Sequence, residues 1–592
     1  MPKTAPLWDS GARKEAFELL EHLWFERGDH QIRARLAEAL ANGPPEHLGE
    51  HEDSTESERQ ALRDRRIFDR IGVLLRGNQA VLPAELNAIY AAIMARHPEW
   101  QPPEDEKARF HIWVEPWEPD TPYSVDYLRN IVDTESLLHI LCTEQEHREG
   151  LLESWRQLVG TEFDRGLAVL EMLSGRGSGG PPDIWRTTLS GLRGRAKEED
   201  LHTRLIELLS MAPQALFNEV EYSRAVADLL LELRSPLVKE RPSESFWRLF
   251  DRALRASEAD PANSEEPRKG DWVTLAINRS LGHLATAFFN AIFAYQLKVS
   301  NRIPIEHRVR LDQLVGITRR DHRLARVVAV SRLPYLFAVD PDWTRATLIP
   351  SMDWANEDEA MALWQGFAWQ PRIGPELWAD ICKPFLAAFT SDRMERFGDF
   401  ERTMAQLLML AGVEFRREDL SADQARASIR AMNPTMREES ISWLWHYLTQ
   451  GAVEGDALRG ERADALWRDR VQPWLNRAWP HERDLLTKNL AVRFALLTTA
   501  TSNAFPDAVD FVLPFLIPTD ASLVLRELNR TNHPEQHPEA TLRLLTAIWD
   551  PNVAWSAHDF REILAKVLES SPALRDEPDV RKYQEWLKIL SF

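Results

Sequence analysis

Three tryptophan-containing stretches decide the fold class of this chain: EAMALWQGFAWQPRIGPELW at residues 359–378, SWLWHYL at 442–448 and RVQPWLNRAWP at 470–480. Their indole side chains recur at the spacing of an α-helix, without the strict alternation of apolar and polar residues that is typical of a β-strand. Proline, which ends helices, breaks up these phrases. The 22 tryptophans among 592 residues therefore predict helices packed on helices along the whole chain.

The length of the chain favours an extended architecture. With 592 residues, 44% of them apolar, it is too long for one compact core, so we expect several domains or an open array of stacked helices. Helical signals recur roughly every 15 to 25 residues, and ~40 residues per helix pair is the period of HEAT-like repeats. We predict an all-α fold, an α-solenoid-like array of degenerate HEAT-like helix pairs, with about 60% helix or more.

Composition shifts divide the chain into three predicted blocks. Residues 1–123 form an N-terminal helical block with a Pro- and Trp-rich excursion at 97–122, which cannot be regular helix throughout. Residues 124–262 form a middle helical block. The polar joint DPANSEEPRKGDW at 260–272 then leads into a C-terminal helical-repeat domain at 270–592.

Charge and cysteine content exclude several classes of protein. The 72 basic and 92 acidic residues give a formal charge of −20, which argues against general nucleic-acid binding because phosphate contacts need a basic surface. The two cysteines, Cys142 and Cys382, are too few for a disulfide framework. We expect both to be small buried apolar side chains in a reducing compartment.

The sequence also argues against export and against a membrane partner. Residues 1–20, MPKTAPLWDSGARKEAFELL, lack the apolar core of a signal peptide. The most apolar stretch, LGHLATAFFNAIFAYQL at 281–297, is slightly short of a membrane-spanning helix and is interrupted by His283, Thr286 and Asn290. We predict that it is a helix buried on most sides, and that the protein is soluble and cytoplasmic.

One glycine-rich segment invites a phosphate-binding interpretation. SGRGSGGPPDIW at 174–185 precedes an expected helix, whose N-terminal amides attract anions. However, no Lys-Ser or Lys-Thr follows the last glycine, and the preceding phrase FDRGLAVLEML at 163–173 is helical rather than a buried strand. We predict a loop between two helices.

Motifs for catalysis and metal binding are missing from the sequence, which has no Walker lysine, no zinc-spaced Cys pairs, no HExxH and no GxSxG. The nearest metal-like cluster is NHPEQHPE at 532–539, with His533, Glu535 and His537. Its prolines oppose the helical geometry that would place both histidines on one ion. We therefore predict no cofactor and no metal site.

A local reversal of charge provides the candidate interaction site. Residues 302–332 carry eight arginines against three acidic residues in an otherwise acidic chain. We predict that Arg319, Arg320, Arg323 and Arg326 bind a protein partner. The alternative is that these arginines lie on solvated helix faces or pair with nearby carboxylates.

Several phrases resemble a known family. The phrases at 319–354 (RRDHRLARVVAVSRLPYLFAVDPDWTRATLIPSMDW) and 357–373 (EDEAMALWQGFAWQPRI), with VQPWLNRAWP at 471–480 and AFPDAVDFVLPFL at 504–516, resemble the helical region of defense-associated sirtuins of bacterial antiphage systems. ALANGPP and HPEWQPPEDEKARFHIW, nearer the N-terminus, are similar to the same region. The resemblance implies a part that senses a phage protein or assembles the complex.

The chain departs from that family in its effector domain. A sirtuin-like domain needs a glycine-rich nucleotide loop after a strand and a His/Asn pair for NAD chemistry, whereas SGARKE at 10–15 leads directly into an expected helix. NAD hydrolysis is therefore not inferred. The resemblance implies a sensor or scaffold module without its effector.

Two functions from different classes follow. The first is a non-catalytic helical-repeat interaction or sensor module of a bacterial antiphage defense system, which binds a phage protein or an NAD-degrading effector. The alternative is a hydrolase with a dispersed active site that uses Asp321, His322 and distant acids. An oligomer is compatible with either function.

Overall fold

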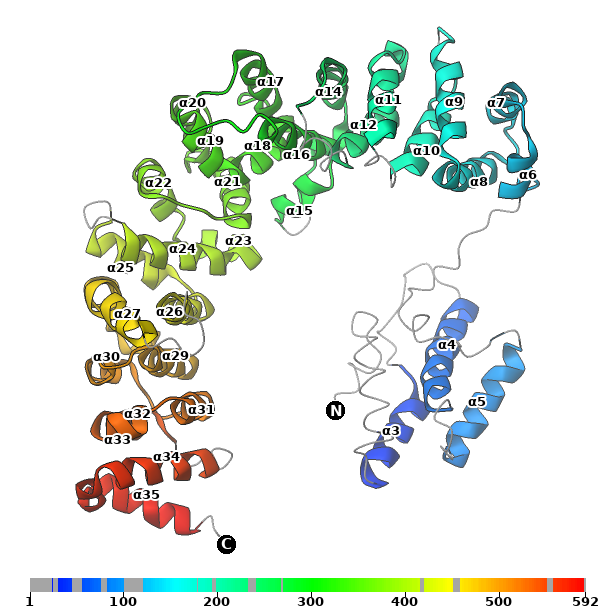
Figure 1. Ribbon diagram of the computed structural model, residues 1–592. Coiled ribbons are helices and arrows are strands. Elements are labelled where there is room, and N and C mark those ends of the chain that lie inside the picture. The colour runs from blue at the N-terminus through cyan, green and yellow to red at the C-terminus, as the bar shows by residue number, and fades with distance from the viewer. Residues whose placement is uncertain are drawn as a thin grey trace. The chain divides into compact units, whose positions relative to one another are not determined.

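The computed structural model describes residues 24, 30–44, 56–75, 82–98, 100, 121–177, 179–193, 199–232, 241–267, 270–415, 420–450, 458–550 and 557–589 (Figure 1). Of these residues 79% are helical, and none of them forms a β-strand. The described part contains one isolated bridge, between Thr519 and Trp549. The prediction of an all-α protein with at least about 60% helix is confirmed.

The chain divides into two compact units, Met1–Pro119 and Asp120–Phe592. The described part of the first unit has three helices, α3 (His30–Asn42), α4 (Glu56–Leu75) and α5 (Ala84–Arg96). They share a small apolar core in which Phe68 stacks on Tyr90 with ring centroids 5.2 Å apart. Arg96 of α5 donates to Asp64 of α4 at 2.8 Å, which joins these two helices.

The second unit is longer and consists of helices throughout its described part. Its first helices are α6 (Val125–Asn130), α7 (Thr134–Thr143), α8 (Arg148–Thr161), α9 (Phe163–Ser174), α10 (Pro182–Leu192), α11 (Glu199–Ser210), α12 (Val220–Glu232), α14 (Glu244–Ser257), α15 (Trp272–Ile277) and α16 (Ser280–Phe293). The next are α17 (Ile305–Val315), α18 (Arg323–Ser331), α19 (Leu333–Val339), α20 (Pro341–Thr347), α21 (Glu357–Trp369), α22 (Pro375–Ala387), α23 (Ser391–Phe397) and α24 (Glu401–Glu414). The last are α25 (Ala422–Ala431), α26 (Pro434–Thr449), α27 (Leu458–Leu466), α28 (Gln472–Ala478), α29 (Lys488–Thr499), α30 (Phe505–Val512), α31 (Ser522–Arg530), α32 (His533–Gln536), α33 (Pro538–Ile548), α34 (Ala557–Ser570) and α35 (Pro578–Ile589).

Helices of the second unit pack mainly on helices that are close to them in the sequence. The most extensive pairings are α8 with α10, α12 with α16, α18 with α21, α24 with α26 and α26 with α29. One hydrophobic cluster nevertheless runs without interruption from Leu128 to Leu587. Each helix therefore buries its apolar stripe against near neighbours in the chain, and their contacts add up to one continuous core.

Polar residues at the helix starts explain several of the boundaries. The side chains of Ser243, Asp271, Asn356 and Thr487 each accept a backbone N–H of the first turn that follows, in α14, α15, α21 and α29. These N-terminal N–H groups have no partner within the helix, so a capping oxygen stabilises the start.

The predicted division into blocks 1–123, 124–262 and 270–592 stays a prediction. The contacts separate the two units after Pro119. On either side of the polar joint at 260–272, α12 and α16 pack directly on each other. The segment SGARKE and residues 101–120 of the Pro- and Trp-rich excursion lie outside the described residues.

The apolar stretch 281–297 coincides largely with α16, in which eleven residues are buried. The prediction of a helix buried on most sides is confirmed. Among the described residues, every helix is too short or too polar to cross a bilayer. Of the two cysteines, Cys382 is buried as expected, whereas Cys142 is only partly buried.

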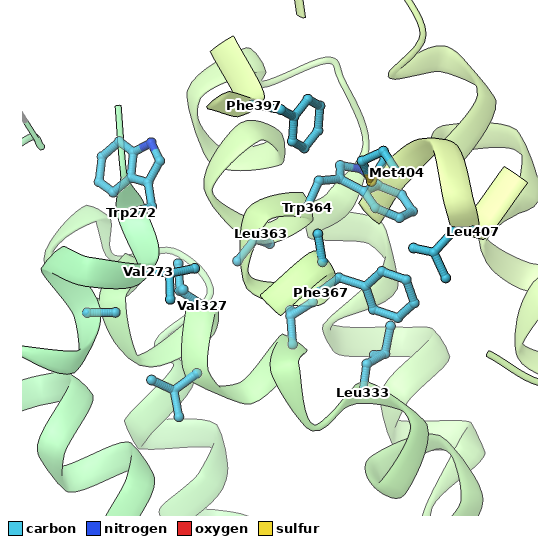
Figure 2. Packing of buried hydrophobic residues seen from close by; sticks show 14 of the residues in the cluster. Trp272, Val273, Val327, Leu333, Leu363, Trp364, Phe367, Phe397, Met404 and Leu407 are labelled. Carbon is cyan, nitrogen blue, oxygen red and sulfur yellow. The ribbon is translucent and has the colours of Figure 1, made fainter. Parts of the chain in front are cut away.

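Helix α21 shows how the tryptophans pack. The indole of Trp364 is fully buried: it donates to the carbonyl of Met352 at 3.0 Å, and its ring lies 5.6 Å from that of Phe385 on α22. In Figure 2, Trp364 and Phe367 point toward the side of Met404 and Leu407. Trp364 and Trp369 are five residues apart, so on an ideal helix they point about 140° apart, and the sequence predicts that both are largely buried, between different neighbouring helices. Trp369 is only partly buried, so the prediction is wrong for this residue. It is the last residue of α21 and packs at the border of the main hydrophobic cluster.

We expect Trp364→Ala to lower the free energy of unfolding by about 3–5 kcal/mol, as other truncations of aromatic core residues do. Trp369→Ala should cost less than half as much, because part of that indole already contacts water. Urea unfolding followed by far-ultraviolet circular dichroism measures both values. Equal losses in the two variants would show that burial does not distinguish these residues.

Gly366 allows α21 to approach α18 closely. A Cβ atom at this position would lie 2.5 Å from the backbone carbonyl oxygen of Val327. Because that oxygen belongs to the backbone of α18, it cannot rotate away as a flexible side chain would. The alanine variant must therefore push the two helices apart.

We expect Gly366→Ala to destabilise the protein by about 1–3 kcal/mol. The matched control is Gly160→Ala in α8, where the nearest atom to an added Cβ among the described residues is 3.8 Å away. That substitution should be neutral or stabilising, because alanine favours the helix over glycine by about 0.5–1 kcal/mol. Chemical denaturation of both variants is the measurement, and a stable Gly366→Ala protein would refute the close approach.

Candidate functional site

The basic stretch contains α17, a short 3-10 helix and α18, and α18 packs on α15, α16, α17 and α21. Arg319 precedes a short 3-10 helix at Arg320–His322, and Arg323 and Arg326 belong to α18, which follows it directly. The structure thus brings all four predicted partner-binding residues to one part of the second unit, but it divides them into a buried pair and a pair with access to solvent.

Arg323 and Arg326 are buried, with 7% and 2% of their side chains exposed. Their Nε atoms donate to the two oxygens of the Glu359 carboxylate, at 2.8 and 2.6 Å. Arg323 also lies over the ring of Trp272, 4.7 Å from its centroid. These two arginines join α18 to α21 and α15, and in this structure they are inaccessible to a partner.

Arg326 has a second set of acceptors. Its Nη1 atom donates to the carbonyl oxygens of Val315, Gly316 and Arg319, at 2.7, 2.9 and 2.9 Å. The carbonyls of a helix C-terminus have no partner within the helix and carry partial negative charge. The guanidinium therefore satisfies the end of α17 while its Nε atom binds Glu359.

Glu359 is the carboxylate on which this buried pair depends. Burial alone would raise the pKa of Glu359, but the hydrogen bonds and positive charges of Arg326 and Arg323 outweigh burial and hold the pKa below its usual value. The residue is therefore ionised at neutral pH. A buried carboxylate that lost its partners, or arginines that lost this carboxylate, would be strongly destabilising.

Arg319 and Arg320 have access to solvent, with 39% and 68% of their side chains exposed. Arg319 bridges two carboxylates: it lies 2.8 Å from Glu258 and donates to Asp321 at 2.6 Å. Arg320 pairs with Glu266. The predicted partner surface is thus limited to these two arginines, and a partner must compete with the acids that already contact them.

The same pairing extends over the whole basic stretch. Arginines along the whole stretch form ion pairs with carboxylates of the chain, as the alternative interpretation expected. The pairs outside the four candidates are Arg302 with Asp342, Arg308 with Asp340, and Arg310 with Asp251. The excess of arginine in the sequence therefore serves contacts between elements as well as any partner.

The residues of the alternative enzyme hypothesis lie in the same place. The His322 ring is fully buried, and its Nδ1 atom lies 2.8 Å from the carbonyl oxygen of Leu314. The adjacent Asp321 is held by Arg319. A general base must reach its substrate, and this histidine is enclosed by the protein.

The glycine-rich segment is a loop between two helices, as predicted. It follows α9 and leads into α10, and residue 178 within it lies outside the described residues. The indole of Trp185 donates to the carbonyl oxygen of Gly179 at 2.7 Å, which fixes the loop on the core. A nucleotide loop would instead follow a buried strand.

The histidine cluster near the C-terminus is engaged in structural contacts. Nδ1 of His533 lies 2.6 Å from the Thr531 hydroxyl, and Nε2 lies 2.7 Å from the carbonyl oxygen of Thr501. The His533 and His537 rings are 6.3 Å apart. Both nitrogens of His533 thus have oxygen partners within the protein.

One polar pocket contains none of the candidate site residues predicted from the sequence. Its volume is about 320 Å³, and it lies beside the start of α16, lined by Arg224, Asp228, Ala262, Glu265, Asn278, Arg279, Ser280 and His283. Its polar side chains already have partners in the protein: Arg224 pairs with Asp260, Arg279 pairs with Glu265, and Nδ1 of His283 lies 2.7 Å from Asp228. Since these residues come from three elements and form no motif, the sequence carried no signal for them.

Comparison with known proteins gives one relative of uncharacterized function. No family model matches the chain. The chain is 25% identical to the uncharacterized protein y4cA of Sinorhizobium fredii over 343 residues, which cover 55% of this chain and 27% of that protein. The match thus spans about a quarter of the relative's length.

We expect Glu359→Gln to lower the free energy of unfolding at pH 7 by about 3 kcal/mol, because the variant leaves two buried cations without a counter-charge. The folded-state pKa lies below the ordinary value of 4.5, so the carboxylate's contribution is fully present above pH 4.5 and is lost as the pH falls below it. The difference between wild type and variant should therefore be constant from pH 7 to about 5 and shrink below about 4.5.

Denaturation at a series of pH values measures this difference. Glu376→Gln, at an exposed position in α22, is the control and should stay within about 0.5 kcal/mol of wild type. A Glu359→Gln protein as stable as wild type at pH 7 would contradict the role given to this carboxylate.

Proposed function

We propose that this chain is a non-catalytic interaction or sensor module of a bacterial antiphage defense system, built as an α-solenoid-like array of degenerate HEAT-like helix pairs. The observation that carries the proposal is the packing of the second unit, in which each helix contacts near neighbours in the sequence along one continuous core. Such arrays present long surfaces to protein partners. The partner is a phage protein or an NAD-degrading effector.

Two further observations support a module that acts with another protein. The resemblance of residues 319–354, 357–373, 471–480 and 504–516 is to the helical part of defense-associated sirtuins, which accompanies an effector. The relative from Sinorhizobium fredii is much longer than the region it shares with this chain. A helical unit that recurs within a longer protein is a natural partner for an effector domain or subunit.

The partner surface that we propose is centred on Arg319 and Arg320. Both are accessible, and their present acids, Glu258 and Glu266, are themselves partly exposed. Exposed ion pairs contribute only about 0–1 kcal/mol, so an acidic partner can replace them at little cost. An overall charge of −20 would also steer acidic partners away from most other surfaces. We place the module in the cytoplasm, without a membrane or general nucleic-acid partner.

The test is a double variant, Arg319→Gln with Arg320→Glu. Arg319 is neutralised rather than reversed because it already holds two carboxylates, and Arg323 is left intact because it is buried on Glu359. We expect the circular dichroism spectrum of the variant to be unchanged. The amount of partner that co-purifies with it should fall at least tenfold, and protection against phage should be lost.

A matched control applies the same two changes elsewhere. Arg204→Gln removes an exposed arginine that bridges Asp164 and Glu171, and Arg248→Glu reverses one that pairs with Glu244. This control should keep both the partner and the protection. Normal binding by the Arg319/Arg320 variant would reject the proposed surface. NAD turnover by the purified chain would reject the non-catalytic role.

A further inference from the structure

His322 has a buried ring nitrogen that lacks a hydrogen-bond partner within the described part of the chain. Its ring is fully buried, and Nδ1 lies 2.8 Å from the carbonyl oxygen of Leu314. A carbonyl oxygen accepts a hydrogen bond, so Nδ1 carries the proton of the neutral ring and Nε2 has a lone pair. Nε2 has no hydrogen-bond partner among the described residues. Buried polar atoms nearly always have a hydrogen-bond partner, so this exception needs an explanation.

Two carboxylates face this nitrogen. Oε1 of Glu258, at the end of α14, and Oδ2 of Asp321 each lie 4.0 Å from Nε2, beyond hydrogen-bonding distance. Arg319 contacts both acids, at 2.8 and 2.6 Å. The cation that neutralises the two carboxylates is therefore Arg319, on the side with access to solvent.

The His322 ring is held in this orientation by the backbone. Gly316 has φ 44°, and a Cβ at this position would lie 2.7 Å from Cγ of the ring. Only glycine fits a left-handed conformation pressed against the ring in this way. Because the close contact and the Leu314 bond both fix the imidazole, Nε2 remains directed at the two acids.

Among the described residues, the two carboxylates that face His322 are matched by only one positive charge, that of Arg319. With the ring neutral, Arg319 faces both Glu258 and Asp321. The other cations nearby are engaged elsewhere, Arg323 and Arg326 with Glu359 of α21, and Arg320 with Glu266. Burial lowers the pKa of His322, and the charge of Arg319 lowers it further, whereas the two carboxylates act in the opposite direction.

We propose that Arg319 and a proton on Nε2 of His322 compete for the same two carboxylates, so that moving Arg319 outward raises the affinity of His322 for a proton from solvent. Once protonated, the imidazolium donates from Nε2 to Glu258 or Asp321 after that carboxylate moves about 1 Å toward the fixed ring, which is the difference between 4.0 Å and an ordinary hydrogen bond. Protonated His322 thus replaces Arg319 as the positive charge beside Glu258 and Asp321.

The competition between Arg319 and the His322 proton regulates the partner surface proposed above. Its link to a partner rests on that proposed function. A partner acid that binds Arg319 removes it from Glu258 and Asp321, and His322 replaces it. By reciprocity, protonation of His322 must strengthen partner binding by the same factor as binding raises its proton affinity. Partner binding therefore becomes tighter as the pH falls through the pKa of His322.

The decisive experiment needs no partner. Histidine NMR titration of the full-length chain, with the His322 signal assigned from a His322→Gln variant, gives the pKa in wild type and in Arg319→Gln. We expect the pKa to rise by about one unit in Arg319→Gln, because removal of the cation leaves two carboxylates facing Nε2. Arg320→Gln, which removes a cation paired with Glu266, should leave it unchanged.

A second variant keeps the test valid if Arg319→Gln is unstable. Glu258→Gln removes one of the two acids and should lower the pKa of His322 relative to wild type. A pKa of His322 that is unchanged or lowered in Arg319→Gln, or unchanged in Glu258→Gln, overturns the competition. If the pKa values move as expected while the Arg319/Arg320 variant still binds its partner, the coupling stands and the proposed partner surface fails.

Discussion

The structure of the second unit depends on one buried group of charges, in which Arg323 and Arg326 of α18 share the carboxylate of Glu359 on α21. Buried charges are costly unless they are paired and hydrogen-bonded, so these three side chains allow a narrow range of positions for the two helices. Gly366 permits the same approach by leaving room for the Val327 carbonyl. Arg326 extends the constraint to the last carbonyls of α17. Charge pairing and close packing thus fix the same junction of helices.

The pairing of arginines with acids on other elements is a general property of this chain. Arg224 binds Asp260, Arg310 binds Asp251, and Arg148 binds Asp183, each across more than thirty residues of sequence. The planar guanidinium suits such contacts because it offers several donors in a fixed geometry. An acidic protein can therefore contain a strongly basic segment without presenting a strongly basic surface.

The proposed function and the His322 inference both follow from the way these pairs divide between interior and surface. Arg323 and Arg326 hold the helices together, whereas Arg319 and Arg320 have access to solvent and pair with acids that are also partly exposed. Arg319 links the surface to the interior: its side chain has access to solvent, but the two acids that it contacts face the buried His322. A surface contact can in this way change the charge of the interior.

The sequence by itself determined the all-α fold class, the helix before the glycine-rich segment and most of the buried helix expected at residues 281–297, because helical periodicity and proline or glycine breaks are local properties. The local excess of arginine in the sequence also identified one group of candidate partner-binding residues, Arg319, Arg320, Arg323 and Arg326. Only the tertiary structure decided which of them are buried, because the acids that pair with them include Glu258, Glu266 and Glu359, which lie on other elements. The partial exposure of Trp369 was likewise decided by which helices lie beside the end of α21. Periodicity places a side chain on a face of its helix, but burial and charge pairing depend on which distant element covers that face.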